Sequence, residues 1–102
     1  MVFNETQKAQ VKKKLVECLR FQEEIVKVVI FGSFINSPSP NDLDIAIFQD
    51  SNQEYLPLAL KYRKILRPIS SVIPTDVVPL KAGVKDGFFL DEILRGEVIY
   101  ER

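Results

Sequence analysis

The sequence predicts an α/β or α+β domain in which one small sheet is covered by helices. Its 102 residues suffice for one compact core, so residues 1–102 are expected to form a single domain. Segments with helical spacing of apolar residues alternate with short β-branched runs, and turn-forming residues separate them. The composition, 46% hydrophobic and 27% charged, is that of an ordinary globular protein.

The first two elements are an amphipathic helix and a buried strand. Residues 5–22 carry apolar side chains at helical spacing, and either Asn4 or Thr6 can act as the N-cap. Residues 25–31 are rich in β-branched side chains and run into Gly32, which is typical of a buried strand that ends in a turn.

The middle of the chain continues this alternation. A turn-rich break at residues 37–41 precedes a second apolar run at residues 43–48, which predicts another buried strand. Residues 53–67 predict a helix that tolerates Pro57 in its first turns and that Pro68 ends.

The last third predicts two strands around a short helix. A third strand lies within residues 72–80, where Pro79 indicates a strand end or a sheet edge. Residues 85–94 predict a helix that Gly96 ends, and residues 98–100 predict a short final strand.

Charge and residue usage exclude several function classes. Lysine plus arginine and aspartate plus glutamate each number 14, and this balance argues against direct nucleic-acid binding through phosphate contacts. The chain has no histidine, which excludes a Ser-His-Asp triad and most zinc sites. Any chemistry must therefore use carboxylates, hydroxyls, lysine or a bound metal ion.

The location of the protein is predicted from three absences. Cys18 is the only cysteine, so no intrachain disulfide can form. The N-terminal residues lack the pattern of a signal peptide, and no apolar run is long enough to cross a membrane. We therefore expect a cytoplasmic protein with no membrane association.

The first functional signal is Gly32-Ser33 directly after the first strand. A strand that runs into Gly-Ser leaves backbone amides free at a turn, where glycine allows close approach and serine adds a hydroxyl donor. Such a turn suits a phosphate group, although a plain turn is the common alternative.

The stronger signal is the pair Asp42 and Asp44. Side chains two residues apart on a strand share a face, about 6.5–7 Å apart at the Cα atoms. Two such carboxylates repel each other unless a cation lies between them, and magnesium is the hard cation that prefers oxygen ligands. The alternative is that Asp42 caps a turn while Asp44 faces solvent on an edge strand.

Asp76 adds a third carboxylate to the candidate site. It stands at the start of the third apolar run, where a neighbouring strand could bring it beside Asp42 and Asp44. A third carboxylate completes a two-metal site and could accept the proton of an attacking hydroxyl.

Gly-Ser, a short loop, Asp-hydrophobic-Asp and a later single aspartate resemble the signature of the polymerase beta superfamily of nucleotidyltransferases. The resemblance covers about residues 26–100, and the size and order of the segments look like the minimal nucleotidyltransferase (MNT) group. Members of that group often act as antitoxins paired with HEPN-domain toxins. The resemblance implies a nucleotidyltransferase-like fold with a small mixed sheet flanked by helices.

The resemblance also implies roles for the candidate residues. Gly32 and Ser33 would bind the phosphates of a nucleoside triphosphate, expected to be ATP. Asp42, Asp44 and Asp76 would hold two Mg²⁺ ions, and Asp76 would also activate the acceptor. The implied reaction transfers AMP, with release of pyrophosphate, to an acceptor on a small helical HEPN-type partner. Independently of the resemblance, the small size of the chain favours a partner chain or a homo-oligomer, because a deep pocket is hard to build in 102 residues.

Two departures from the family pattern keep alternatives open. Family members commonly follow Gly-Ser with Ala-Arg-Gly, whereas this chain has Phe34-Ile35-Asn36 and lacks that arginine. The connection of eight residues between Ser33 and Asp42 is also shorter than usual. A catalytically weak or inactive antitoxin-type binding module is therefore one alternative, and a structural α/β domain without a nucleotide site is another.

Overall fold

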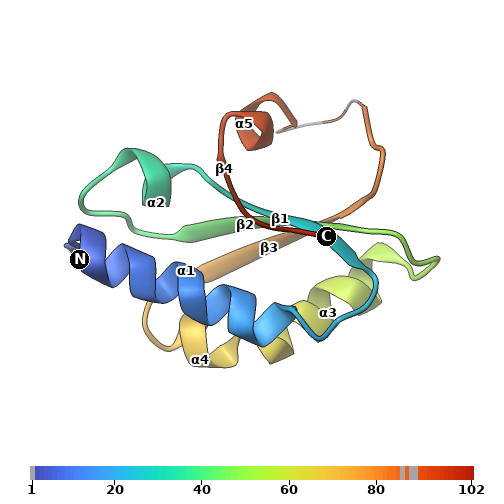
Figure 1. Ribbon diagram of the computed structural model, residues 1–102, viewed down its shortest axis with the longest axis horizontal. Coiled ribbons are helices and arrows are strands. Elements are labelled where there is room, and N and C mark those ends of the chain that lie inside the picture. The colour runs from blue at the N-terminus through green and yellow to red at the C-terminus, as the bar shows by residue number, and fades with distance from the viewer. Residues whose placement is uncertain (1, 86, 88–89) are drawn as a thin grey trace.

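The computed structural model describes residues 2–85, 87 and 90–102, and these form one four-stranded mixed sheet (Figure 1). The strands are β1 (Ile25–Phe31), β2 (Leu43–Gln49), β3 (Thr75–Lys81) and β4 (Glu97–Glu101). Their order across the sheet is β3-β2-β1-β4, so β2 lies inside the sheet and β3 forms an edge. β1 is antiparallel to β2 and β4, whereas β2 and β3 are parallel. The expected mixed sheet is confirmed.

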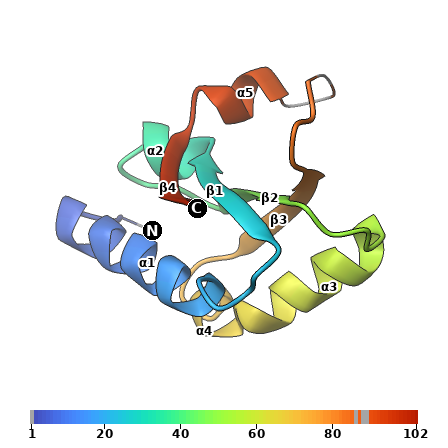
Figure 2. The ribbon, with the colours of Figure 1, turned by 45° about the vertical axis from the view of Figure 1, so that its right-hand side comes forward.

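Helices cover both faces of this sheet. They are α1 (Glu5–Leu19), α2 (Ser33–Asn36), α3 (Tyr55–Ile65), α4 (Arg67–Ser70) and α5 (Leu90–Leu94). Figures 1 and 2 show α1, α3 and α4 together on one face, and α5 on the other. Because two parallel strands cannot be joined by a hairpin, β2 and β3 need a crossover connection, and α3 with α4 supplies it.

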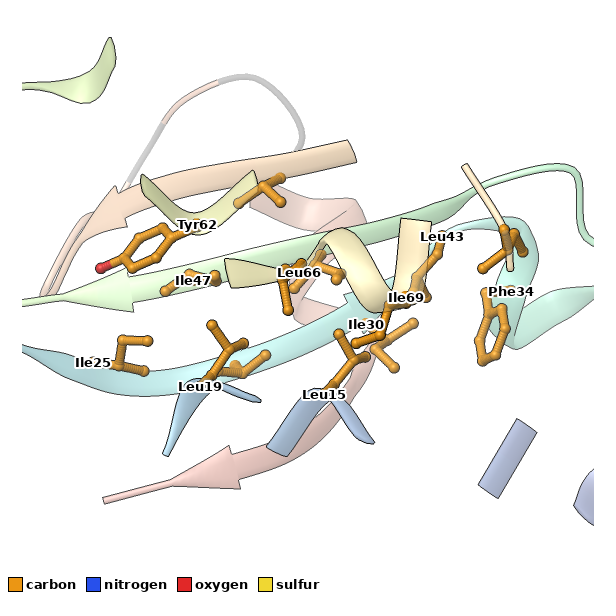
Figure 3. Close-up of a cluster of buried hydrophobic side chains, with 14 of the residues drawn as sticks. Leu15, Leu19, Ile25, Ile30, Phe34, Leu43, Ile47, Tyr62, Leu66 and Ile69 are labelled. Carbon is orange, nitrogen blue, oxygen red and sulfur yellow. The ribbon is translucent and has the colours of Figure 1, made fainter. Parts of the chain in front are cut away.

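The main core lies between the sheet and the three helices α1, α3 and α4 (Figure 3). Its fully buried side chains include Leu15, Leu19, Ile25, Ile30, Phe34, Leu43, Ile45, Ile47, Leu58, Tyr62 and Leu66. A second, smaller cluster lies on the opposite face under α5, and it consists of Val29, Phe31, Ala46, Phe48 and Ile93. Since side chains alternate along a strand, Asp44 shares the face of this second cluster.

The start of α1 is fixed by Asn4 and not by Thr6. The Asn4 side chain accepts a hydrogen bond from the Gln7 amide at 2.8 Å, and the Gln7 side chain accepts one from the Asn4 amide at 2.9 Å. This capping box satisfies amides that the first helical turn leaves without partners. The helix ends at Leu19, earlier than the predicted residue 22, because the chain turns there to enter β1.

The helix predicted over residues 53–67 is shorter in the structure, and a second helix follows it. α3 ends at Ile65, and Pro68 lies in the first turn of α4 instead of ending α3. Proline is tolerated in a first helical turn because the amide that it lacks has no helical partner there. The prediction that Pro79 marks a sheet edge is confirmed, since it lies in the edge strand β3.

The predicted helix over residues 85–94 is also too long. Among the described residues of this range, Lys85 and Gly87 are not helical and helix is present over Leu90–Leu94, while Asp86, Phe88 and Phe89 lie outside the described residues. Gly96 follows the helix, and its amide bonds the Ile93 carbonyl at 2.9 Å. A Cβ at this position would collide with the backbone carbonyl of Ile30, so close packing against β1 requires the glycine.

Within residues 2–85, 87 and 90–102, no helix has the length and apolar character that a membrane span requires.

Candidate functional site

β1 ends at a glycine that has no room for a side chain. Gly32 has a φ of 77°, and a Cβ built there would lie 2.7 Å from Oδ2 of Asp44. α2 begins at the next residue, Ser33, and the amides of Ile35 and Asn36 bond the Gly32 carbonyl at 3.1 and 3.2 Å. The predicted Gly-Ser turn therefore packs directly against a carboxylate of β2.

The loop that follows Gly32 is held by the start of the chain. Lys8 is 7% exposed, and its Nζ donates a hydrogen bond of 2.7 Å to the Ser37 carbonyl. Its ammonium group also lies 5.6 Å from the centre of the Phe34 ring, which makes an edge contact with Phe3 at 5.7 Å. The Phe3 amide donates to the Pro38 carbonyl at 3.0 Å. These contacts fix the loop from the side opposite the carboxylates.

The three aspartates lie at the same end of the sheet. Asp44 and Asp76 are register partners on the parallel strands β2 and β3, and they therefore lie side by side on one face. Asp42 precedes β2 by one residue, and its carbonyl lies 3.5 Å from the Ser33 hydroxyl. Asp42 and Asp76 are exposed, and Asp44 is half-buried. Because β2 is an inner strand, the alternative that placed Asp44 on an edge strand is wrong.

Negative charge accumulates around Asp44. Burial raises the pKa of the Asp44 carboxyl above its usual value, and the nearby charges of Asp76, Asp42 and Glu92 raise that pKa further. Both causes penalise the ionised form of Asp44. A cation at this end of the sheet would remove much of that penalty.

The residues present fit a hard divalent cation in their chemistry. Across the described parts of the chain, no three His, Cys, Asp or Glu side chains are already grouped to hold a metal ion. The groups around Asp44 are nevertheless all carboxylates, and their oxygen atoms are the ligands that magnesium prefers. Metal binding by Asp42, Asp44 and Asp76 stays a prediction.

A cleft opens beside Gly32, and it brings in two residues that the sequence did not single out for a role. The cleft measures about 410 Å³, and its walls are formed by Gly32, Ile35, Asn36, Glu92, Arg95 and Gly96. Glu92 and Arg95 come from the α5 region, which contacts β1. The sequence alone indicated neither residue, because a short helix does not reveal which strand end it covers.

A larger hollow of about 450 Å³ lies on the other face of the sheet, between α1 and α4. Apolar side chains such as Phe3, Val11 and Ile69 dominate its lining, and none of the lining residues is acidic. It therefore lacks the groups that would hold a metal ion, and the smaller cleft beside Gly32 is the better candidate.

Known structures share this fold. A chain in the crystal structure of the toxin-antitoxin MntA-HepT superposes with a TM-score of 0.64 at 14% identity, covering 92% of this chain and 73% of that one. A chain in a complex of the tri-AMPylated HEPN toxin of Shewanella oneidensis with MNT antitoxin gives a TM-score of 0.63 at 14% identity, covering 93% and 73%. No curated protein sequence matches the chain.

A sequence model of a protein family shows which family the chain belongs to, whereas structural similarity at such low identity shows only the fold. The model described as polymerase beta, nucleotidyltransferase matches residues 13–102, which contain every strand of the sheet and all three aspartates. The Gly-Ser turn, the Asp44–Asp76 pairing and the mixed sheet all lie inside this match. The chain therefore belongs to the polymerase beta nucleotidyltransferase family.

Proposed function

We propose that this protein is a magnesium-dependent nucleotidyltransferase that transfers AMP from ATP to a hydroxyl group on a HEPN-type partner protein. The observation that carries the proposal is the pairing of Asp44 with Asp76 on adjacent parallel strands, beside a glycine that leaves no room for a side chain. Family membership supports the reaction class. The charge that accumulates at Asp44 supports the need for a cation.

Each candidate residue has a role in the proposed reaction. Asp42, Asp44 and Asp76 would hold two magnesium ions, which neutralise the triphosphate when they are bound. The backbone at Gly32 and the Ser33 hydroxyl would bind phosphate oxygens. Most of the rate enhancement would come from positioning and charge neutralisation, as in other phosphoryl transfers.

The transfer step itself needs a proton acceptor. The acceptor oxygen forms a bond to the α-phosphorus of ATP, while the bond from that phosphorus to the bridging oxygen of pyrophosphate breaks. The proton of the acceptor hydroxyl passes to the Asp76 carboxylate, and pyrophosphate leaves. Asp76 is exposed at the edge strand, where an acceptor from another protein can approach.

The partner assignment rests on the solved structures of similar fold. They are complexes of an MNT antitoxin with a HEPN toxin, and one of those toxins is tri-AMPylated. By analogy, we propose that a HEPN-type protein supplies the acceptor hydroxyl for this chain as well.

Mass spectrometry of the partner after incubation with this protein and MgATP tests the proposal. A HEPN-type protein from the same genome is the partner to use, and we expect its mass to rise by one or more AMP units. Asp76→Asn should abolish this transfer but retain most MgATP binding, since its role includes activating the attacking oxygen. Asp91→Asn, an exposed carboxylate on α5, is the matched control and should transfer AMP normally.

A second candidate function is a binding module that neutralises a toxin by contact alone. The segment Phe34-Ile35-Asn36, which stands where the family commonly has Ala-Arg-Gly, favours it. A stable complex without any mass increase would support this function and refute the transferase. A mass increase that survives replacement of all three aspartates would refute the proposed mechanism.

A further inference from the structure

The cleft beside Gly32 contains a single cationic side chain among its described lining residues. That residue is Arg95, and it shares the cleft with Glu92. The neighbouring carboxylates at Asp42, Asp44 and Asp76 make this end of the sheet strongly negative. A triphosphate would add further negative charge, so the site needs positive charge from the protein as well as from metal ions.

The loop after Ser33 cannot supply that charge. The residues from Phe34 to Asn41 include no lysine or arginine. The contacts described above fix this loop through Lys8, but the Lys8 ammonium is itself buried and bonded to the Ser37 carbonyl. The positive charge must therefore reach the phosphates from another element.

Arg95 is held in place through its backbone. Its amide bonds the carbonyls of Asp91 at 3.3 Å and Glu92 at 3.2 Å, at the end of α5. The residues on either side anchor it, because Ile93 is 1% exposed in the second core cluster and Gly96 packs against β1. The position of Arg95 relative to Gly32 thus depends on the packed sheet and not on a free loop.

The guanidinium group of Arg95 is available for a ligand. Arg95 is exposed, and its side chain forms no salt bridge or hydrogen bond with any residue that the structure describes. By contrast, Lys61 pairs with Glu24 at 2.9 Å and Arg102 pairs with Asp50 at 2.7 Å.

We infer that Arg95 binds the β- and γ-phosphate oxygens of the nucleotide and replaces the arginine that this chain lacks after Gly32-Ser33. A guanidinium group presents a planar fork of donors that matches two phosphate oxygens, which a lysine cannot reproduce. The inference rests on the proposed function and adds to it the residue that selects a triphosphate over a monophosphate.

Calorimetric titration of the metal-loaded protein with MgATP and, separately, with AMP tests this role. A hydrogen bond to a charged group contributes about 1.5–3 kcal/mol, so Arg95→Ala should weaken MgATP binding roughly 10-fold to 100-fold. AMP lacks the outer phosphates, and its weaker binding should change much less. Arg95→Lys should recover part of the affinity for MgATP. Arg63→Ala removes an exposed arginine from α3 on the other face of the sheet and should change neither affinity.

Each result decides a different point. Unchanged MgATP affinity in Arg95→Ala would overturn the inference and leave the proposed function standing. Equal losses for MgATP and AMP would also overturn it, because the contact would then not involve the outer phosphates. If the unaltered protein binds no MgATP, the proposed function fails and the role of Arg95 fails with it. The melting temperatures of the ligand-free variants verify that the fold is intact.

Discussion

Replacing Asp44 by asparagine should stabilise the protein in the absence of metal. Neighbouring strands lie about 4.8 Å apart, and two unit charges at roughly 5 Å repel by about 0.8 kcal/mol in water and about 3 kcal/mol at an effective dielectric constant of 20. Asp44 is half-buried and Asp76 is exposed, so the lower part of this range applies. We expect a gain of about 1 kcal/mol, or roughly 4–8 °C in Tm for a domain of this size.

The gain should depend on pH in a defined direction. The folded protein raises the pKa of Asp44, so ionising this carboxyl opposes folding. This penalty on stability is fully present when the pH lies above the pKa of Asp44 in the folded protein. It disappears when the pH falls below the pKa of the same group in the unfolded chain, which is about 3.9. Asp44→Asn should therefore melt at a higher temperature than the unaltered protein at pH 7, and the two proteins should melt alike near pH 3.

Circular dichroism melts at both pH values, with a chelator present, measure this difference. Asp91→Asn serves as the control, because that exposed carboxylate is not among the charges that act on Asp44, and it should give no increase at pH 7. An Asp44→Asn protein that melts at or below the temperature of the unaltered protein at pH 7 would refute the reasoning. An equal increase at both pH values would attribute the gain to packing instead of charge.

Three further predictions concern the packing of the fold and the turn at Gly32. Gly96→Ala should cost about 1–3 kcal/mol in a urea unfolding curve, since the added methyl group meets the Ile30 carbonyl; an unchanged midpoint would contradict the packing described. Tyr62→Phe should cost about 1.5–3 kcal/mol at pH 7, because the hydroxyl donates a 2.8 Å hydrogen bond to the Glu24 carboxylate. Burial opposes ionisation of Glu24, but its hydrogen bonds outweigh burial and lower the pKa of this carboxyl. The loss of stability in Tyr62→Phe should therefore shrink as the pH falls through that pKa. A loss that stays constant with pH would argue against the hydrogen bond between Tyr62 and Glu24. Gly32→Ala should cost about 1–2 kcal/mol for its positive φ and should reduce the rise in Tm that MgATP produces; a normal rise would show that the turn tolerates a side chain.

Local sequence patterns predicted the strands better than the helices. β1 and β2 follow closely from β-branched runs bounded by turn residues, because such runs fit only a buried sheet. The helix ends were less predictable, as the break before Pro68 shows. A helix ends where tertiary packing redirects the chain, and the spacing of apolar residues along the sequence does not show where this happens.

The sequence indicated the three aspartates and the Gly-Ser turn as candidates, but not how they lie relative to one another. The spacing of Asp42 and Asp44 indicated a shared face, whereas the pairing of Asp44 with Asp76 depends on the crossover that makes β2 and β3 parallel. The contribution of α5 was missed, because Glu92 and Arg95 reach the cleft only through the close packing of Gly96 on β1. Long-range packing of this kind leaves no periodic signal in a single sequence.

The N-terminal residues are bonded to the loop after Gly32, so hydrogen exchange near the N-terminus can report on the opening of that loop. The Phe3 amide is bonded to the Pro38 carbonyl, so it can exchange with solvent deuterium only when that contact opens. A nucleotide that orders the loop should therefore slow exchange at Phe3, about thirty residues earlier in the chain. The protection of one amide near the N-terminus would then report how often the Gly32-Ser33 turn loses its support, with no label placed in the site.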